Sequence, residues 1–383
     1  MITYIYQIII HLIYFSMRIF AIFNQKIALW FRLQKDWKSA LNKANSKDII
    51  WFHVASVGEF EMAIPIIKQI KSTQHLQKIV VSFFSTSGIS FYSPDETIDY
   101  FFLYPKDYKK NVNFILENMQ PKCLIIVKNE RWLNLVQQTY LKKIPIYQVE
   151  VEQKKHAFVY QQYLNYFQQF IKKTFYIKNG SLQIESVKNT EKINLPIIQE
   201  FTSNHFTIIL GSCYIEEVKL ISSLYNKHTN LKIILCPHEI NHQTFDQYQS
   251  FFKGKISKYS DLIIESNILF IDKMGILKHI YPYTQIAFIG GGFYNKLHNI
   301  FEAAIYNNII LTGNKINRNY LNSLADETQL IHKIENLGSL EFIISKAYNS
   351  PNFMNVNKEK WNNFFNLHQN TAQFITETIL SDL

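Results

Sequence analysis

At 383 residues the chain is long enough for two domains, each with its own hydrophobic core. Hydrophobic residues make up 47% of the sequence and charged residues 18%, a balance that excludes an intrinsically disordered chain. The formal net charge is +10, but no arginine-rich tract and no interleaving of basic and aromatic residues accompanies it, so we expect no nucleic-acid partner.

The first 23 residues are mostly apolar and about long enough to cross a bilayer, and no small-residue cleavage site follows them. Their polar residues recur every three or four positions and therefore share one helical face: Thr3, Gln7, His11, Tyr14 and Arg18. Such a stripe suits a helix that lies in the membrane interface, or packs on its own domain, better than one surrounded by lipid. Single-pass anchoring, monotopic anchoring and a simple buried helix all remain open.

Basic residues are concentrated beside this apolar segment. Residues 1–50 contain seven Lys or Arg against two Asp, a surplus of five that is half of the net charge. This placement favours an anionic membrane surface as a partner. Under the positive-inside rule, the basic residues after the helix would keep the rest of the chain in the cytoplasm.

Short apolar runs alternate with helical patterns from Asp48 onward, which predicts βαβ units on parallel sheets. The expected strands are 49–54, 79–84, 123–127, 144–149, 206–210, 232–236, 262–264, 269–271, 285–289 and 309–311. The expected helices include 59–71, 108–119, 131–142 and a last amphipathic helix over 355–380. The predicted domains are a membrane-associated helix over 1–24, Rossmann-like domains over 25–177 and 206–354, a linker over 178–205 and a C-terminal helix over 355–383.

Three polar clusters follow predicted strands in the first half, and open parallel sheets bind ligands at such strand ends. One of them, Ser85-Thr86-Ser87-Gly88, is typical of ordinary helix capping. In the segment HVASVGE, Ser56 and Glu59 have the S-x-x-E spacing of a helix capping box. Alternatively, Glu59 is a general base, a role that suits a partly desolvated carboxylate. Residues 128–132, KNERW, either line a cleft or form a surface cluster of salt bridges.

The second half has further clusters after its strands. Residues 285–313 read as a buried strand, three glycines and a helix start, which is a favourable arrangement for binding an anion. A tight βα connection with capping residues is the alternative. Other clusters are GSCY at 211–214, PHE at 237–239 and MGIL at 274–277. With no Walker loop, no G-x-S-x-G elbow and no DxD metal pair, the pattern predicts a cleft for a nucleotide-linked donor and no metal site.

The three cysteines also indicate that the chain has no metal site. Cys123, Cys213 and Cys236 are widely spaced and form no CxxC pair, so neither a zinc site nor a disulfide framework is indicated. A reducing compartment is consistent with this pattern.

Taken together and in this order, these segments resemble the Kdo transferase family, the 3-deoxy-D-manno-octulosonic acid transferases of lipopolysaccharide synthesis. The segments are WFHVASVGE, IIVKNERW, GSCYIEE, PHEI, MGIL-x-x-x-Y and GGGF-x(4)-HNIFEAA. The second has the K-x-E-x-W form of Bacteroidetes-like members. The resemblance implies an α/β GT-B fold, with two Rossmann-like domains facing a cleft and an N-terminal membrane-associated helix.

The resemblance also implies a reaction. Kdo would pass from CMP-Kdo to a lipid A precursor (lipid IVA) at the cytoplasmic face of the inner membrane, with inversion and without metal or cofactor. Glu59 would be the general base and Glu130 would support the transition state, with Ser56, Gly58 and Lys128 on the acceptor side. The donor-binding residues would be Gly211, Ser212, Pro237, His238, Gly275, Ile276, Leu277, His298, Asn299, Ile300, Phe301 and Glu302, the last at the ribose.

Two segments depart from the family pattern. NLPIIQEF at 194–201 stands where the family usually has a Gly-Asp/Asn motif with a basic residue, and Lys188 and Lys192 are the candidate replacements. Gly313-Asn314 stands in place of a glycine-proline element. Two alternatives follow: a non-catalytic, membrane-bound remnant of the family, or a GT-B transferase that uses another nucleotide sugar.

Overall fold

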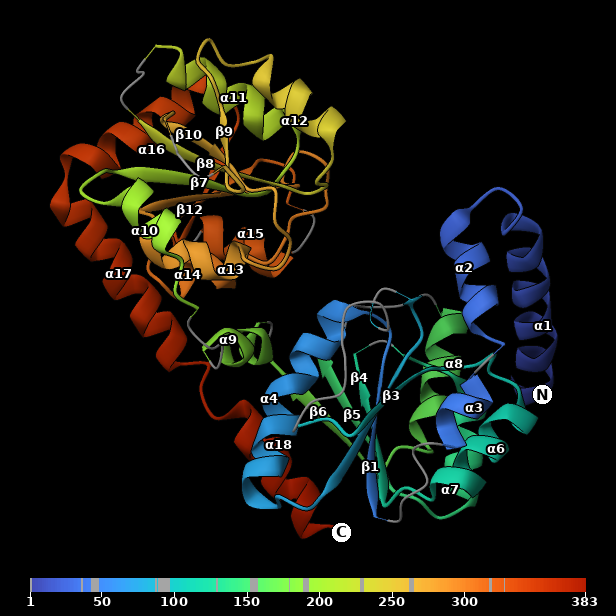
Figure 1. Ribbon diagram of the computed structural model, residues 1–383. Helices are drawn as coiled ribbons and strands as arrows, with labels where there is room; N and C mark the ends of the chain where they lie inside the picture. The colour runs from blue at the N-terminus through green and yellow to red at the C-terminus, as the bar shows by residue number, and fades with distance from the viewer. Residues whose placement is uncertain are drawn as a thin grey trace. The chain divides into compact units, whose positions relative to one another are not determined.

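The computed structural model describes residues 2–35, 37–42, 48–86, 88, 97–128, 130–151, 158–178, 180–188, 193–227, 231–261, 265–316, 319–326 and 328–383. The chain divides into two compact units (Figure 1). The first comprises Met1–Ser186 with Asn370–Leu383, and the second comprises Val187–Gln369. Each unit is an α/β structure with its own parallel sheet, as the alternating pattern predicted.

The sheet of the first unit has the strand order β3-β2-β1-β4-β5-β6. Its strands are β1 (Ile49–Val54), β2 (Lys78–Phe83), β3 (Tyr100–Leu103), β4 (Cys123–Val127), β5 (Ile146–Val151) and β6 (Lys173–Ile177). The accompanying helices are α1 (Ile2–Phe20), α2 (Gln25–Leu33), α3 (Trp37–Asn42), α4 (Val57–Thr73), α6 (Lys109–Met119), α7 (Leu133–Leu141), α8 (Phe158–Gln168), α9 (Ser181–Lys188) and α18 (Thr371–Ser381).

Helices cover both faces of this sheet. Successive residues of a strand point to opposite faces. Phe52 of β1 belongs to the core that contains α4 and α18, whereas Trp51 belongs to the core that contains α3, α6 and α7. Both side chains are fully buried. Burial on both faces explains why the central strands are continuous apolar runs in the sequence.

The sheet of the second unit has the order β13-β12-β11-β7-β8-β10-β9. Its strands are β7 (Thr207–Cys213), β8 (Lys232–Pro237), β9 (Ser257–Lys258), β10 (Ile268–Phe270), β11 (Ile286–Ile289), β12 (Ile309–Gly313) and β13 (Ile331–Ile334). Its helices are α10 (Pro196–Thr202), α11 (Ile215–Tyr225), α12 (His242–Gln249), α13 (Leu277–Ile280), α14 (Phe301–Ala304), α15 (Asn319–Asp326), α16 (Leu337–Asn349) and α17 (Pro351–Asn366), with a 3-10 turn over Tyr281–Tyr283.

Four strands were not predicted: β3, β6, β9 and β13. Each forms an edge of its sheet. The predicted strand at 144–149 begins later, at Ile146, after Pro145, which has no N–H to donate to a neighbouring strand. The predicted strand at 262–264 lies outside the described residues.

The prediction of one helix over 355–380 is wrong. α17 ends at Asn366 and α18 begins at Thr371, and Asn370 between them has a left-handed φ of 64°. The carboxylate of Glu185 accepts hydrogen bonds from the N–H groups of Thr371 and Ala372, at 2.6 and 3.0 Å. An acidic side chain there satisfies two unpaired donors of the first helical turn. α18 then packs on α4 within the first unit.

α1 turns its polar stripe toward the first unit. Thr3 Oγ1 lies 3.1 Å from the Tyr166 hydroxyl, and Gln7 donates to Asn134 Oδ1 at 2.5 Å. The helix is long and apolar enough to cross a membrane, yet only 11% of its most apolar window is buried. A simple buried helix is therefore excluded. Large apolar side chains point outward instead, among them Ile8, Leu12, Ile13, Phe15, Ile19 and Phe20.

Asp107, in the loop between β3 and α6, fastens α1 to the unit and is fully buried. Its N–H donates to the Tyr14 hydroxyl of α1 at 2.9 Å. Burial raises the pKa of Asp107, and the hydrogen-bond donors act in the opposite direction. Its carboxylate accepts from the hydroxyls of Tyr6 and Tyr104, at 2.6 and 2.7 Å, and from the N–H groups of Asn134 and Leu135, each at 3.0 Å.

Replacing Asp107→Asn should destabilise the protein by about 2–4 kcal/mol, because the amide cannot accept all four hydrogen bonds and leaves buried donors unpaired. Denaturant unfolding measures the loss. The control is Asp48→Asn, whose carboxylate is exposed and pairs with Lys122, and which should change stability by less than about 1 kcal/mol. Equal effects of the two variants would contradict the structural role of Asp107.

Candidate functional site

Strands β2, β1 and β4 are neighbours, and polar groups meet at their carboxyl ends. His53 of β1 is fully buried. Its Nδ1 lies 2.8 Å from Ser82 Oγ of β2, and its Nε2 lies 3.4 Å from Glu130 Oε2 after β4. The second contact is longer than an ordinary hydrogen bond, so it is chiefly electrostatic. A buried imidazole therefore joins a hydroxyl on one strand to a carboxylate after another.

The contact with Glu130 selects the tautomer of His53. Trp51 Nε1 donates to Ser82 Oγ at 2.8 Å, so the hydroxyl proton can go to His53 Nδ1 or to the Phe52 carbonyl oxygen, which lies 3.4 Å away. If Ser82 donates it to His53 Nδ1, the ring proton sits on Nε2 and faces Glu130. The other tautomer would place a lone pair against the carboxylate. We assign the Nε2–H form on this basis.

Glu130 is held firmly. Trp132 Nε1 donates to its Oε2 at 2.6 Å, and the Glu130 side chain is only 12% exposed. Arg131 instead pairs with Glu150, and both of these side chains are largely buried. Segment 128–132 is therefore not a surface salt-bridge cluster. Lys128 is half-buried with a left-handed φ of 67°, and Asn129 lies outside the described residues.

Glu59 lies in the first turn of α4 and is half-buried. The Ser56 hydroxyl donates to Glu59 Oε2 at 2.6 Å. In the described part of the chain, Ser56 makes no side-chain cap to the helix backbone, so the pair is not a complete capping box. Gly58 is exposed beside them. The turn therefore presents a carboxylate that a neighbouring hydroxyl orients.

Rings from three strand ends meet in the second unit. Tyr214 follows β7, His238 follows β8 and His298 lies in the loop after β11, and β11, β7 and β8 are neighbours. Tyr214 stacks on His238 with the ring centroids 4.8 Å apart, and the centroids of His238 and His298 are 4.9 Å apart. The Tyr214 hydroxyl lies 3.3 Å from His298 Nε2. Three of the predicted clusters thus form one group.

Other predicted donor residues lie at the ends of β7 and β8 or in the turn after β10. Ser212 has a left-handed φ of 51° beside a β-bulge, and Pro237 ends β8. Gly275 is an exposed turn residue with a φ of +83°. Leu277 begins α13 after it, whereas Ile276 is buried.

The Asn299–Glu302 turn is ordered by its own side chains. Asn299 Oδ1 accepts from the N–H of Phe301 at 3.0 Å, and Asn299 Nδ2 donates to Glu302 at 3.4 Å. Burial, and then the charge of Glu302, raises the pKa of Tyr281. A Cβ on Gly211 would lie 2.1 Å from the Tyr281 hydroxyl, so Gly211 serves packing there. Ile300 and Phe301 are buried.

The glycines after β11 are required by close backbone packing. A Cβ on Gly290 would lie 2.1 Å from the carbonyl oxygen of Ser212, and Gly291 has a φ of +87°. The fully buried Glu217 accepts from the N–H groups of Gly291 and Tyr214, at 2.9 and 3.0 Å. The N–H of Gly291 is therefore occupied by a protein carboxylate. A tight connection describes this loop better than an open anion cradle.

Residues 31–185 match the family described as 3-Deoxy-D-manno-octulosonic-acid transferase (kdotransferase). A 3-deoxy-D-manno-octulosonic acid transferase from Aquifex aeolicus is 28% identical over 327 residues, which cover 78% of this chain and 88% of the relative. The family match over residues 31–185 and this relative support the Kdo transferase family for the chain. The resemblance drawn from the ordered motifs is confirmed, and the protein is a glycosyltransferase.

Solved structures share the fold of this chain. A UDP-GlcNAc 2-epimerase from Neisseria meningitidis aligns with a TM-score of 0.60 and 11% identity, over 87% of this chain and 100% of that one. A glycosyltransferase from Rickettsia africae aligns with a TM-score of 0.56 and 12% identity, over 88% and 100%. At these identities the likeness shows the fold alone, which is the predicted GT-B fold.

Several residues of this site had no role in the sequence prediction. Tyr214 and Glu217 lie within the family-like segment GSCYIEE, but they also contact His298 and Gly291, which lie after β11. Ser82 interrupts the apolar run of β2, and such a polar residue in a buried strand was the available signal. Tyr104 carried no signal, because an aromatic residue at a strand end suits any core.

Replacing Glu217→Gln should destabilise the second unit by about 1–3 kcal/mol, since an amide cannot accept from both backbone N–H groups through two oxygens. Hydrogen exchange at Gly291 and Tyr214 should become faster, which mass spectrometry can measure. The neighbouring Glu216→Gln is the matched control, because that side chain is half exposed and pairs only with Lys219 among the described residues. Unchanged exchange in Glu217→Gln would refute the proposed anchoring.

Proposed function

We propose that the protein transfers Kdo from CMP-Kdo to the primary hydroxyl of a lipid A precursor, with inversion and without a metal ion. Family membership supports Kdo transfer in lipopolysaccharide synthesis. The observation that supports the assignment of roles is the placement of two carboxylates, Glu59 and Glu130, after the adjacent strands β1 and β4. Each is oriented by a hydrogen-bond donor.

Glu59 acts as the general base in this proposal. The acceptor oxygen attacks the anomeric carbon of Kdo from the side opposite CMP, and the bond from that carbon to the phosphate oxygen breaks. The hydroxyl proton passes to the Glu59 carboxylate, and CMP leaves with the electron pair of the broken bond. Since Ser56 holds Oε2, we assign proton acceptance to Oε1. A positioned base of this kind contributes roughly 10²–10⁴-fold to the rate.

Glu130 is assigned a supporting role in the transition state. Its charge favours a proton on His53 Nε2, and Trp132 keeps the carboxylate in place. The resulting group of fixed dipoles needs little rearrangement as charge develops during transfer. Gly58 and Lys128 complete the acceptor side of the proposal, where the missing side chain of Gly58 leaves room for a ligand.

CMP is assigned to the carboxyl edge of β7, β8 and β11. The imidazole N–H groups of His238 and His298 can donate to phosphate oxygens, and the Glu302 carboxylate can accept from ribose hydroxyls. No basic residue is assigned to the departing phosphate. Lys188 lies over the ring of Phe365, 5.8 Å from its centroid, and Lys192 lies outside the described residues.

The departure at 194–201 supports weighing two alternatives, because part of this segment forms α10 where the family motif is expected. A transferase with another nucleotide sugar would be stabilised more by UDP or GDP than by CMP in thermal shift measurements. A non-catalytic remnant would release no CMP from CMP-Kdo in the presence of tetra-acylated lipid A precursor. An active homologue, assayed in parallel, would release CMP.

Replacing Glu59→Gln should reduce transfer by at least about 100-fold, because the amide cannot take the acceptor proton. CMP release from CMP-Kdo with the lipid A precursor measures the rate. The affinity for CMP should remain within about threefold of that of the unmodified protein, because Glu59 lies in the first unit and the assigned donor residues lie in the second. Ser56→Ala is the control that removes only the orienting hydrogen bond. Loss of both transfer and CMP binding in Glu59→Gln would indicate a structural role.

We further propose that α1 docks the enzyme on the cytoplasmic face of the inner membrane as a monotopic helix. Thr3 and Gln7 of its polar stripe contact its own unit, and large apolar side chains point outward. An exposed apolar helix face with basic neighbours is typical of interfacial binding. A helix surrounded by lipid would have to give up those polar contacts.

The variant Ile13→Gln/Phe20→Gln should weaken binding to phospholipid vesicles by roughly tenfold or more. The two apolar side chains are lost, and with them the favourable free energy of moving their surface from water into the membrane. Co-sedimentation with vesicles measures this. The control Leu76→Gln/Leu141→Gln changes two side chains of the same unit that are 94% and 65% exposed but lie outside α1. If both variants bind as tightly as the original protein, α1 is not the docking element.

A further inference from the structure

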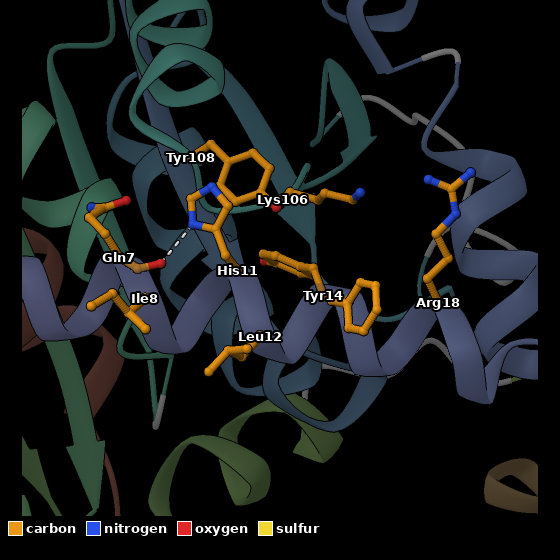
Figure 2. A pocket seen from close by; sticks show the side chains of 9 residues that line it. Gln7, Ile8, His11, Leu12, Tyr14, Arg18, Lys106 and Tyr108 are labelled. Carbon is orange, nitrogen blue, oxygen red and sulfur yellow. Dashed lines mark hydrogen bonds between the residues drawn. The ribbon is translucent and has the colours of Figure 1, made fainter.

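A hollow of about 670 Å³ lies beside α1, outside the sites described above. One part of its wall is polar and contains His11 and Arg18 of α1 with Lys106 and Tyr108 from the segment before α6. His11 stacks on Tyr108 with the ring centroids 4.6 Å apart. Figure 2 shows Lys106 extending along α1 toward Arg18. The hollow therefore gathers two cations on one side.

Among the described residues, these cations have no counterion. Within the described chain, neither Arg18 nor Lys106 lies within 4.0 Å of a carboxylate oxygen. Burial, and then the charges of Arg18 and Lys110, lowers the pKa of Lys106. The ring of Phe31 lies 5.2 Å from Lys106 Nζ and supplies only a weak attraction. A bound anion would relieve this repulsion.

The remainder of the wall is apolar. Ile8, Leu12 and Phe15 line it and are 64%, 59% and 66% exposed. They belong to the outward face of α1, and Figure 2 shows Ile8 and Leu12 pointing away from the side that carries Lys106. Since all of these residues line one hollow, an anion at its polar wall would share that hollow with an apolar surface. That combination matches a charged headgroup with its acyl chains.

We propose that the hollow is a binding site for the phosphate of an anionic membrane phospholipid, held by Arg18 and Lys106. Guanidinium and ammonium groups donate charge-assisted hydrogen bonds to phosphate oxygens. The inference rests on the proposed docking of α1 and is independent of Kdo transfer. Its consequence is that α1 docks at a defined depth and rotation, with one lipid headgroup as part of the contact.

The test compares two variants that lose the same charge. Arg18→Gln/Lys106→Gln empties the hollow of cations, whereas Lys26→Gln/Lys35→Gln removes two exposed basic residues near the same helix but outside the hollow. Binding is measured by co-sedimentation with phosphatidylcholine vesicles that contain or lack about 30% phosphatidylglycerol, at physiological salt. General surface attraction is worth roughly fivefold per charge and is common to both variants.

The hollow variant should bind phosphatidylglycerol vesicles at least tenfold more weakly than the control variant, and both should bind pure phosphatidylcholine equally. The charge-conserving Arg18→Lys/Lys106→Arg should retain most of the binding. Circular dichroism melts show whether each variant is folded. Equal losses in the two variants would overturn the proposal in favour of diffuse attraction. Failure of the unmodified protein to bind any vesicle would instead refute the docking of α1.

Short-chain phosphatidylglycerol, short-chain phosphatidylcholine and inorganic phosphate then identify the source of the anion. Native mass spectrometry should detect one phosphatidylglycerol adduct on the unmodified protein and on Lys26→Gln/Lys35→Gln, but not on Arg18→Gln/Lys106→Gln. Inorganic phosphate should compete only weakly, because it lacks the acyl chains that contact Ile8 and Leu12. Competition by phosphate at equal concentration would show a site for soluble anions and contradict the lipid assignment.

Discussion

The hydrogen bonds of Asp107 are the constraint on which the first unit depends. One fully buried carboxylate joins α1, the end of β3 and the start of α7, because its donors come from all three. The ring of Tyr104, one of those donors, lies 4.6 Å from the ring of His53, which in turn contacts Glu130. The outward helix and the proposed acceptor site are therefore built on a common polar centre.

Glu217 has a comparable position in the second unit, and the two carboxylates explain what the sequence could predict of the site. The motif residues were found because strand ends carry polar residues in a recognisable order, and family resemblance supplied their roles. The partners of Asp107 and Glu217 were not predictable, because both residues bind backbone N–H groups of distant segments. Every residue except proline has the same backbone N–H, so the sequence does not show which N–H a carboxylate will bind.

The fold was predictable where strands are buried on both faces. β1 and β4 are buried at every residue, and β7 and β8 at all but one each, so their sequences are mainly apolar. The four missed strands are all edges and have at most five residues, and in β6 exposed positions also interrupt the apolar run. The break before α18 was missed because the apolar period continues across it, while the left-handed Asn370 redirects the chain.

The return of α18 to the first unit has a consequence for synthesis on the ribosome. The second unit is continuous from Val187 to Gln369 and can complete its core while α18 is still being made. The first unit cannot, because Ile375 and Ile379 of its core are made after the whole second unit. α1 emerges long before Asn134 and Tyr166, the partners of its polar side. During translation, the nascent helix therefore meets its surroundings with both its polar and its apolar side uncovered.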